Sequence, residues 1–518
     1  MTITFLVLAA AVAVFVWDRL PVGAVALGVA LALWATGVLG LDQSLAGFGD
    51  PTVIFIASLF VVSEGLEAAG VTSWAGQELV ARVGESRTRL MVMMMSLVAV
   101  LTALISVNGA VAALAPVAVV IAIRLGRSPS QLLMPVAFAA HAGSMLLLTG
   151  TPVNVIVSQY AADAGVGRFG FFEFALVGVP LVLGTVAIVV LFGERLLPTR
   201  TPRSIPADFS DHARTLVDQY RLAEDPPNLL TRRYGVAEVV IPPRSSVVGD
   251  TVFPGMVTDS GDLVVLAVQR NGRDLESEEA TLAVGDTLLV QGTWGALVRN
   301  LDDPDVLVVD PPDLIRRQAV PLGPGAKRAV VVLGAMVILL ATGAVPPAVA
   351  GMLAAGALVL GGVLTIEQAY ACISWTTVIL VGGMISLSTA MTQTGAAEKL
   401  ADWLVRIVGD AGPHALLLGL FVLTAALGQL ISNMATALIV IPVAISAAGD
   451  MDVSAKPVLM AVAVSAAAAF LTPVATPANL MVLGPGGYRF GDYWKLGLPL
   501  LALFGVVAVL LVPVFWSF

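Results

Sequence analysis

Long apolar runs fill both ends of this 518-residue chain and leave a polar block between them. Crossing about 30 Å of hydrocarbon takes roughly 20 apolar residues in a helix, and most of the runs approach that length. They lie at 3–17, 22–40, 52–68, 88–105, 109–124, 131–160 and 172–197, and then at 328–344, 347–364, 375–392, 414–431, 434–448, 457–481 and 494–516. Only 12% of the residues are charged, whereas a soluble domain has about 25%. We therefore expect an α-helical polytopic membrane protein.

The polar block is typical of a water-soluble insert. Between Arg200 and Arg317 the chain carries 12 basic and 19 acidic side chains, 31 of its 63 charged residues. Short β-branched runs at 236–241, 263–269 and 287–291 predict strands, and hence a small α+β domain. The predicted division is a first membrane repeat at 1–199, a linker at 200–230, a soluble domain at 231–311, a linker at 312–326 and a second membrane repeat at 327–518.

The two apolar halves repeat one another. Thr52-Val53-Ile54 recurs as Thr377-Val378-Ile379, and Thr151-Pro152-Val153-Asn154 recurs as Thr476-Pro477-Ala478-Asn479, both at an offset of 325. Leu104-Ile105-Ser106 recurs as Leu430-Ile431-Ser432 at an offset of 326. Agreement at a nearly constant offset predicts an internal duplication, which is common among secondary transporters.

The positions of Lys and Arg predict the orientation of the halves. If 88–124 and 414–448 each enter the membrane as a re-entrant hairpin, each half crosses five times, and the odd number inverts the second half. Most basic residues of the short loops then share one side with the insert, and only Arg168, Lys399, Arg406 and Lys456 lie on the other. We therefore expect a cytoplasmic (inner) membrane protein with its insert, 200–326, in the cytosol and both termini extracytoplasmic.

Four polar interruptions predict where a solute binds. They are Ser106-Val107-Asn108-Gly109, Leu148 to Asn154, Ser432 to Thr436 and Thr472 to Asn479. None contains Asp, Glu, Lys, Arg or His. Hydroxyl, amide and carbonyl oxygens suit a hard cation, while a helix N-terminus attracts an anion. The combination predicts cation-coupled uptake of an anion.

At these interruptions the chain resembles the divalent anion/sodium symporter family of the ion-transporter superfamily, which carries sulfate or di- and tricarboxylates. The residues that carry the resemblance are Gly150-Thr151-Pro152-Val153-Asn154, Phe470-Leu471-Thr472-Pro473 and the stretch from Asn479 to Phe490. The resemblance implies a homodimer in which a transport domain moves elevator-fashion against a scaffold. The amphipathic stretches 74–84 and 396–409 would then be the arms that link the two domains.

The same resemblance assigns roles to individual residues. The sodium sites would be Ser106, Asn108 and Gly150 in one half, and Ser432, Asn433 and Ala475 in the other. The anion would face Asn108, Thr151, Asn433, Thr436 and Thr476, with Asn154 and Asn479 in support. Sodium ions are the expected cofactors, and no organic cofactor is expected. The family's paired Ser-Asn-Thr motif is imperfect here, because Gly109 and Met434 replace hydroxyl residues.

The insert has a resemblance of its own. Residues 234–310 resemble the C-terminal ligand-binding domain of RCK proteins, the regulators of potassium conductance, through 243–249 and 284–292. This resemblance implies dimerisation and a small regulatory ligand. No Gly-rich dinucleotide-binding fingerprint precedes the domain.

Other functions remain open. A cation/proton or arsenite antiporter of the same superfamily would need a membrane-embedded acidic residue beside the interruptions, and an RCK-regulated cation channel would need a repeated pore filter. Covalent catalysis has no candidate residues, so we expect no enzyme, and the acidic insert gives no reason to expect a nucleic-acid partner. His141, in the run that leads to Thr151, could titrate near neutral pH, but we expect a hydrogen-bonded packing role.

Overall fold

The structure is a computed structural model of the chain. It describes residues 1–518 except 18, 73, 76–77, 79–85, 125–126, 201–215, 218, 221–228, 232–233, 276–278, 311, 313–314, 316–321, 324 and 409–410. The chain forms two compact units, each considered by itself. The helical unit comprises Met1–Glu67, Glu78–Pro206 and Arg328–Phe518, and the insert unit comprises Ala68–Gln77 and Ala207–Lys327. Most of the predicted arm 74–84 and of the two predicted linkers lies outside the described residues.

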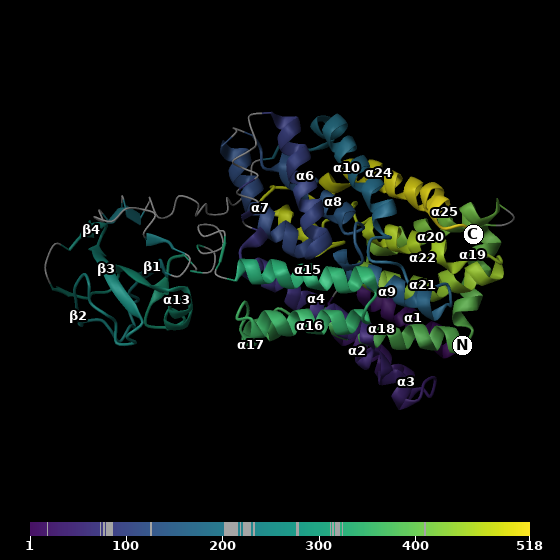
Figure 1. Ribbon diagram of the computed structural model, residues 1–518, viewed down its shortest axis with the longest axis horizontal. Coiled ribbons are helices and arrows are strands. Elements are labelled where there is room, and N and C mark those ends of the chain that lie inside the picture. The colour runs from purple at the N-terminus through teal and green to yellow at the C-terminus, as the bar shows by residue number, and fades with distance from the viewer. Residues whose placement is uncertain are drawn as a thin grey trace. The chain divides into compact units, whose positions relative to one another are not determined.

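The first half of the helical unit follows the apolar runs (Figure 1). Its helices are α1 (Thr2–Trp17), α2 (Val22–Ala35), α3 (Leu41–Leu45), η1 (Ala46–Gly49), α4 (Pro51–Ala68), α6 (Arg87–Leu104), α7 (Val107–Arg124), α8 (Ser130–Gly143), η2 (Leu148–Gly150), α9 (Pro152–Asp163) and α10 (Ala175–Leu196). The single run predicted at 131–160 is divided into α8 and α9 by a stretch that is mostly outside an α-helix.

The second half also follows its apolar runs. Its helices are α15 (Ala326–Thr342), α16 (Pro347–Leu360), α17 (Ile366–Ala371), α18 (Trp375–Gln393), α19 (Ala396–Val408), α20 (Pro413–Gly428), α21 (Asn433–Asp450), α22 (Ala455–Ala467), α23 (Pro477–Leu483), η4 (Phe490–Asp492), α24 (Tyr493–Val506), the π-helical turn η5 (Val507–Leu511) and α25 (Val512–Phe515). The run predicted at 457–481 is divided into α22 and α23.

Helix length and composition agree with a membrane protein. Among the described residues, six helical segments are long and apolar enough to cross a bilayer: Leu41–Ala68, Arg87–Leu104, Ala175–Leu196, Trp375–Gln393, Asn433–Asp450 and Phe490–Phe515. Several other apolar helices, such as α1 and α22, have 10–17 residues. The number of crossings per half therefore stays a prediction.

Close backbone contacts recur at equivalent places in the two halves. A Cβ atom added to Gly178 of α10 would lie 2.2 Å from the carbonyl oxygen of Met145. A Cβ atom added to Gly497 of α24 would lie 2.3 Å from the carbonyl oxygen of Phe470, which is 325 positions after Met145. Small residues allow such close approach of helices in membranes. These glycines hold α10 and α24 against the interrupted segments that contain the candidate site.

The insert unit contains a small antiparallel sheet. Its strands are β1 (Tyr234–Val240), β2 (Thr251–Val252), β3 (Leu263–Arg270), β4 (Arg273–Asp274), β5 (Ala280–Thr281), β6 (Thr287–Thr293) and β7 (Leu307–Val308), and α13 (Trp294–Asn300) follows β6. The main sheet has the order β4-β3-β6-β1-β7, and β2 pairs with β5. The three predicted strands correspond to β1, β3 and β6.

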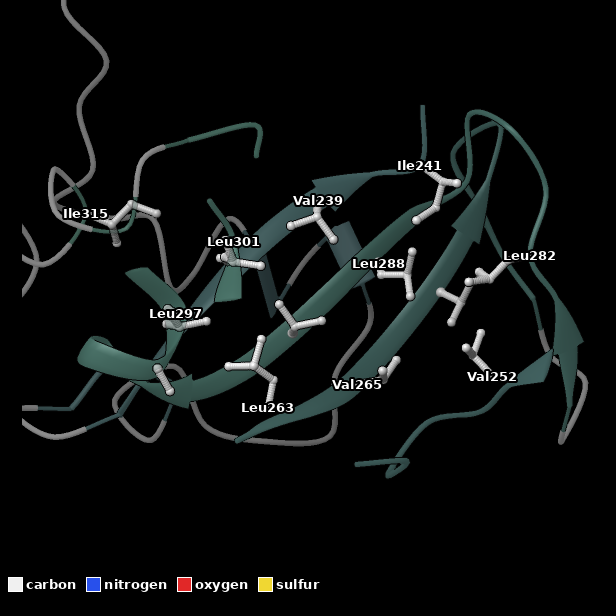
Figure 2. Packing of buried hydrophobic residues seen from close by; sticks show 14 of the residues in the cluster. Val239, Ile241, Val252, Leu263, Val265, Leu282, Leu288, Leu297, Leu301 and Ile315 are labelled. Carbon is white, nitrogen blue, oxygen red and sulfur yellow. The ribbon is translucent and has the colours of Figure 1, made fainter. Parts of the chain in front are cut away.

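Two hydrophobic clusters hold this domain together. Figure 2 shows Val239 of β1, Val265 of β3 and Leu288 of β6 in the same buried cluster as Leu297 of α13. Alternate residues of β1 and β6 point to this face, and β3 joins them with a register shift between Val265 and Ala267. Val236, Ala267 and Leu289, from the same three strands, belong to the second cluster. The β3–β4 turn has Asn271 at φ 52° and Gly272 at φ 73°, which is the backbone that a tight Asn-Gly hairpin requires.

Candidate functional site

Two helix breaks lie inside the helical unit, one in each half. The first separates α8 from α9 and the second separates α22 from α23. After each break the helix begins again with a threonine N-cap, followed by proline at the first helical position. Proline is favoured there because its missing N–H would have no helical partner anyway. The oxygen Oγ1 of Thr151 accepts from the backbone nitrogen of Val153 at 3.4 Å, and that of Thr476 accepts from Asn479 at 3.3 Å.

Asparagine side chains stabilise the non-helical backbone of both breaks. Nδ2 of Asn154 donates to the carbonyl oxygens of Ser144 and Leu147 at 2.9 and 3.0 Å. Nδ2 of Asn479 donates to the two equivalent carbonyls of its own break at 2.8 and 3.1 Å. Both asparagines are fully buried. Because unpaired carbonyls are costly in a membrane interior, these bonds allow a non-helical segment to persist there.

Two helix–helix turns form the tips of the α6–α7 and α20–α21 hairpins. The oxygen Oγ of Ser106 accepts from the backbone nitrogen of Gly109 at 3.1 Å, and that of Ser432 accepts from Ala435 at 3.3 Å. Each hydroxyl caps the helix that leaves the turn. The predicted Ser-centred interruptions therefore lie at two helix N-termini.

Each tip contacts the break of its own half. In the first half, Oγ1 of Thr149 donates to the carbonyl oxygen of Ala103 at 3.0 Å. In the second half, Gln429 joins the two: its Nε2 donates to the carbonyl oxygen of Ala468 at 3.1 Å, and its Oε1 accepts from the nitrogen of Leu471 at 3.0 Å. Sequence reasoning missed Gln429. Its signal was an amide side chain at the end of the apolar run 414–431.

The second arm of each break packs against the other half. α9 contacts α21 and α22, and α23 contacts α7 and α8. His141 of α8 bonds to α23: its Nε2 lies 3.1 Å from Oγ1 of Thr476 and 3.3 Å from Oδ1 of Asn479. The expected hydrogen-bonded histidine is therefore present, and its partners belong to the predicted site.

The predicted site residues occupy distinct environments. Ser106, Ser432, Thr151 and Thr476 are helix caps, and Gly150 and Ala475 are buried just before Thr151 and Thr476. Asn433 and Thr436 lie in the first turns of α21, and Asn108 is exposed at the start of α7. A Cβ atom added to Gly150 would lie 2.3 Å from the carbonyl oxygen of Ser144, so only glycine fits there.

Several buried oxygen atoms of this region have no hydrogen-bond partner among the residues that the structure describes. They are Oδ1 of Asn154, Oδ1 of Asn433 and Oγ1 of Thr436. Unpaired buried acceptors are unusual in folded proteins and need an explanation. Within the described part of the chain, no group of three or more His, Cys, Asp or Glu side chains could hold a metal ion. The unpaired atoms are neutral amide and hydroxyl oxygens, a type of ligand that suits an alkali cation.

Comparison with known proteins identifies the family. The citrate transporter family matches residues 12–452 and 337–518 in two overlapping segments. The chain belongs to this family. This citrate transporter family member is 33% identical to YfbS, an uncharacterized transporter of Escherichia coli (strain K12), over 99% of this chain and 98% of that protein. It is 27% identical to the probable sodium/sulfate cotransporter 3 of Chlamydomonas reinhardtii, over 57% of this chain and 33% of that protein.

A solved structure shares the fold of this citrate transporter family member. The YdaH transporter of Alcanivorax borkumensis aligns with a TM-score of 0.51 at 16% identity, over 94% of this chain and 89% of that one. The predicted class, a helical membrane protein with a small sheet insert, is confirmed. The predicted relation to the divalent anion/sodium symporters is also confirmed, and the protein is a multi-pass transporter rather than an enzyme.

Proposed function

We propose that this protein is a sodium-coupled secondary transporter that takes up a small divalent or polyvalent anion, sulfate or a di- or tricarboxylate. The observation that carries the proposal is the pairing, in each half, of a serine-capped tip with a threonine-capped break. Free N–H groups at helix N-termini attract an anion. Hydroxyl and carbonyl oxygens beside them can bind a cation. The name of the Chlamydomonas relative, a probable sodium/sulfate cotransporter, supports this pair of solutes.

We further propose which residues bind the two solutes. The sodium sites are Ser106, Asn108 and Gly150, and Ser432, Asn433 and Ala475. The anion contacts Asn108, Thr151, Asn433, Thr436 and Thr476. The unpaired buried oxygens of Asn433 and Thr436 support this assignment, because a buried acceptor without a partner costs about 1–3 kcal/mol and a bound solute would relieve that cost.

The arrangement in the membrane is also a proposal. Transport occurs by an elevator movement within a homodimer, and the predicted topology puts residues 200–326 in the cytosol with both termini extracytoplasmic. The insert serves as an RCK-type regulatory domain for a small ligand. The antiparallel sheet of β1, β3 and β6 supports a compact domain of this kind.

Uptake into proteoliposomes tests the transport proposal. Radiolabelled sulfate, succinate and citrate are supplied with an inward sodium gradient, with a proton gradient and with neither. Wild type is compared with Asn108→Ala and Asn433→Ala. Asn271→Gly is the matched control, because it removes an asparagine from an insert turn whose φ of 52° glycine accepts.

We expect sodium-dependent uptake of at least one anion, lost in both site variants and kept in the control. Exchange of sodium or protons without movement of any anion would replace the proposal with the antiporter function. Uptake that a proton gradient alone drives would keep the anion and change the coupling ion.

A further inference from the structure

One histidine of the first half reaches the break of the second half. His141 lies on α8 with 2% of its surface exposed. Its ring meets Phe470 edge-on, with centroids 5.9 Å apart and planes at 85°. Its ring nitrogen Nε2 forms hydrogen bonds with Thr476 and Asn479 of the second break. The imidazole therefore packs against the ring of Phe470 while its Nε2 points to the break.

The surrounding hydrogen bonds determine which atom donates. Nδ2 of Asn479 already donates to the carbonyl oxygens of Ala469 and Thr472, which fixes the orientation of the amide. Its Oδ1 therefore faces His141, and a carbonyl oxygen only accepts. Nε2 of His141 must carry the hydrogen. This N–H is shared between Oδ1 of Asn479 and Oγ1 of Thr476.

Among the described residues, the first break has no such donor. The position equivalent to His141, at the offset of 325, is Ala466, a buried residue of α22. The equivalent of Asn479 is Asn154, whose Oδ1 is buried without a partner among the described residues. The two breaks, alike in backbone and in their asparagine bonds, thus differ in this one contact.

We propose that His141 is a positioning residue for the second break. By donating to Thr476 and Asn479 it fixes the cap of α23 and, through the asparagine, the carbonyl of Thr472. Those groups lie next to Ala475, which we propose as part of the second sodium site. The link between His141 and cation binding therefore rests on the proposed function. The second cation site is held rigid by the first half of the chain, and the first site lacks that support.

Two readouts test this role with the full-length protein. One is hydrogen exchange of the backbone amides at 471–480, with 146–155 as the internal reference. The other is the sodium concentration that gives half-maximal anion uptake. The variants are His141→Gln, whose Nε2 can replace that of the imidazole, and His141→Asn, whose shorter amide cannot reach the break. His414→Ala is the control, because His414 is exposed on α20.

We expect His141→Asn to raise exchange at 471–480 by roughly fivefold, the effect of losing one net hydrogen bond, and to raise the half-maximal sodium concentration. His141→Gln should restore both values, and His414→Ala should change neither. Unchanged exchange in His141→Asn would overturn the proposal. So would equal effects of Asn and Gln, because ring volume rather than the N–H would then matter. If wild type takes up no anion, the proposed function fails, and exchange still decides the role of His141.

Discussion

Asn154 and Asn479, 325 positions apart, perform the same task in the two halves of the chain. Each is fully buried at the third residue of a helix that restarts after a break, and each donates both amide hydrogens to carbonyls on the far side of that break. A side chain with two donors is needed because two carbonyls lose their helical partners at once. These two residues therefore satisfy the carbonyls that the breaks would otherwise leave unpaired.

Replacement of either asparagine should destabilise the protein. Asn154→Ala and Asn479→Ala each leave two carbonyls without a donor, at a cost of about 1–3 kcal/mol per buried group. Asn479→Ala should have the larger effect, because it also removes one of the two acceptors of His141. The measurement is the thermal unfolding midpoint in detergent together with anion uptake. Asn271→Gly should leave both unchanged, and unaltered unfolding of the two alanine variants would contradict this account of the breaks.

Added methyl groups at Gly178 and Gly497 should prevent correct packing. The new Cβ atoms would lie 2.2 and 2.3 Å from backbone carbonyl oxygens, which cannot move aside as a flexible side chain can. Overpacking of this kind costs about 1–3 kcal/mol or more. We expect little folded Gly178→Ala or Gly497→Ala protein in size-exclusion chromatography of detergent extracts.

The matched controls for these substitutions are Gly28→Ala and Gly334→Ala. Both glycines are within helices, and a Cβ atom at either meets nothing within 4 Å. Alanine has the higher helix propensity, so folded protein should be recovered in normal amounts. Loss of folded protein in the controls and the close-contact variants alike would mean that helix flexibility, rather than the carbonyl contact, explains the result.

An ion pair joins the end of the first half to the second. The guanidinium of Arg200 donates from Nε and Nη2 to the carboxylate of Asp492 at 3.2 and 3.0 Å, and Asp492 is 5% exposed. Arg200→Ala removes both guanidinium donors from a buried carboxylate, which keeps the backbone N–H of Arg489, and should lower stability by about 1–3 kcal/mol. The exchanged pair Arg200→Asp with Asp492→Arg should recover part of this loss. Thermal unfolding of the single and double variants measures the coupling, and additive effects would show that the contact is not stabilising.

The sequence predicted the helices better than the breaks. Apolar length located α4 and α7 to within two residues, because a helix in lipid must bury its own backbone groups. The first break was predicted at Leu148–Asn154, but α8 already ends at Gly143. Residues 144–147 contain no proline or glycine. Two of their carbonyls, those of Ser144 and Leu147, are bound by Asn154 from the next helix. No local sequence pattern indicates that contact.

In the candidate site, too, contacts between distant residues could not be predicted. Its caps were predictable, since Ser and Thr before Pro or an apolar run are local signals. The contacts of Gln429 were missed, and the hydrogen bonds expected of His141 could not be given partners, because those partners are far away in sequence or in the other half. The weak signal they share is a polar side chain inside an apolar run, which rarely occurs in a membrane helix without a partner.

The buried carboxylate of the insert should make that domain sensitive to acid. The side chain of Asp286 is fully buried, and the guanidinium of Arg270 donates to it twice at 2.7 Å. This hydrogen bond lowers the pKa of Asp286 below its usual value. A carboxylate with a lowered pKa in the folded state stabilises the fold above its unfolded pKa, and this stability is lost as the pH falls through the folded pKa.

Exchange of the amides at 263–270, relative to unfolded-chain rates at each pH, should therefore rise at acid pH. Asp286→Asn should raise it at neutral pH and respond less to acid, whereas Asp259→Asn at an exposed turn should follow wild type. The same acid response in Asp286→Asn and wild type would assign the sensitivity to another group.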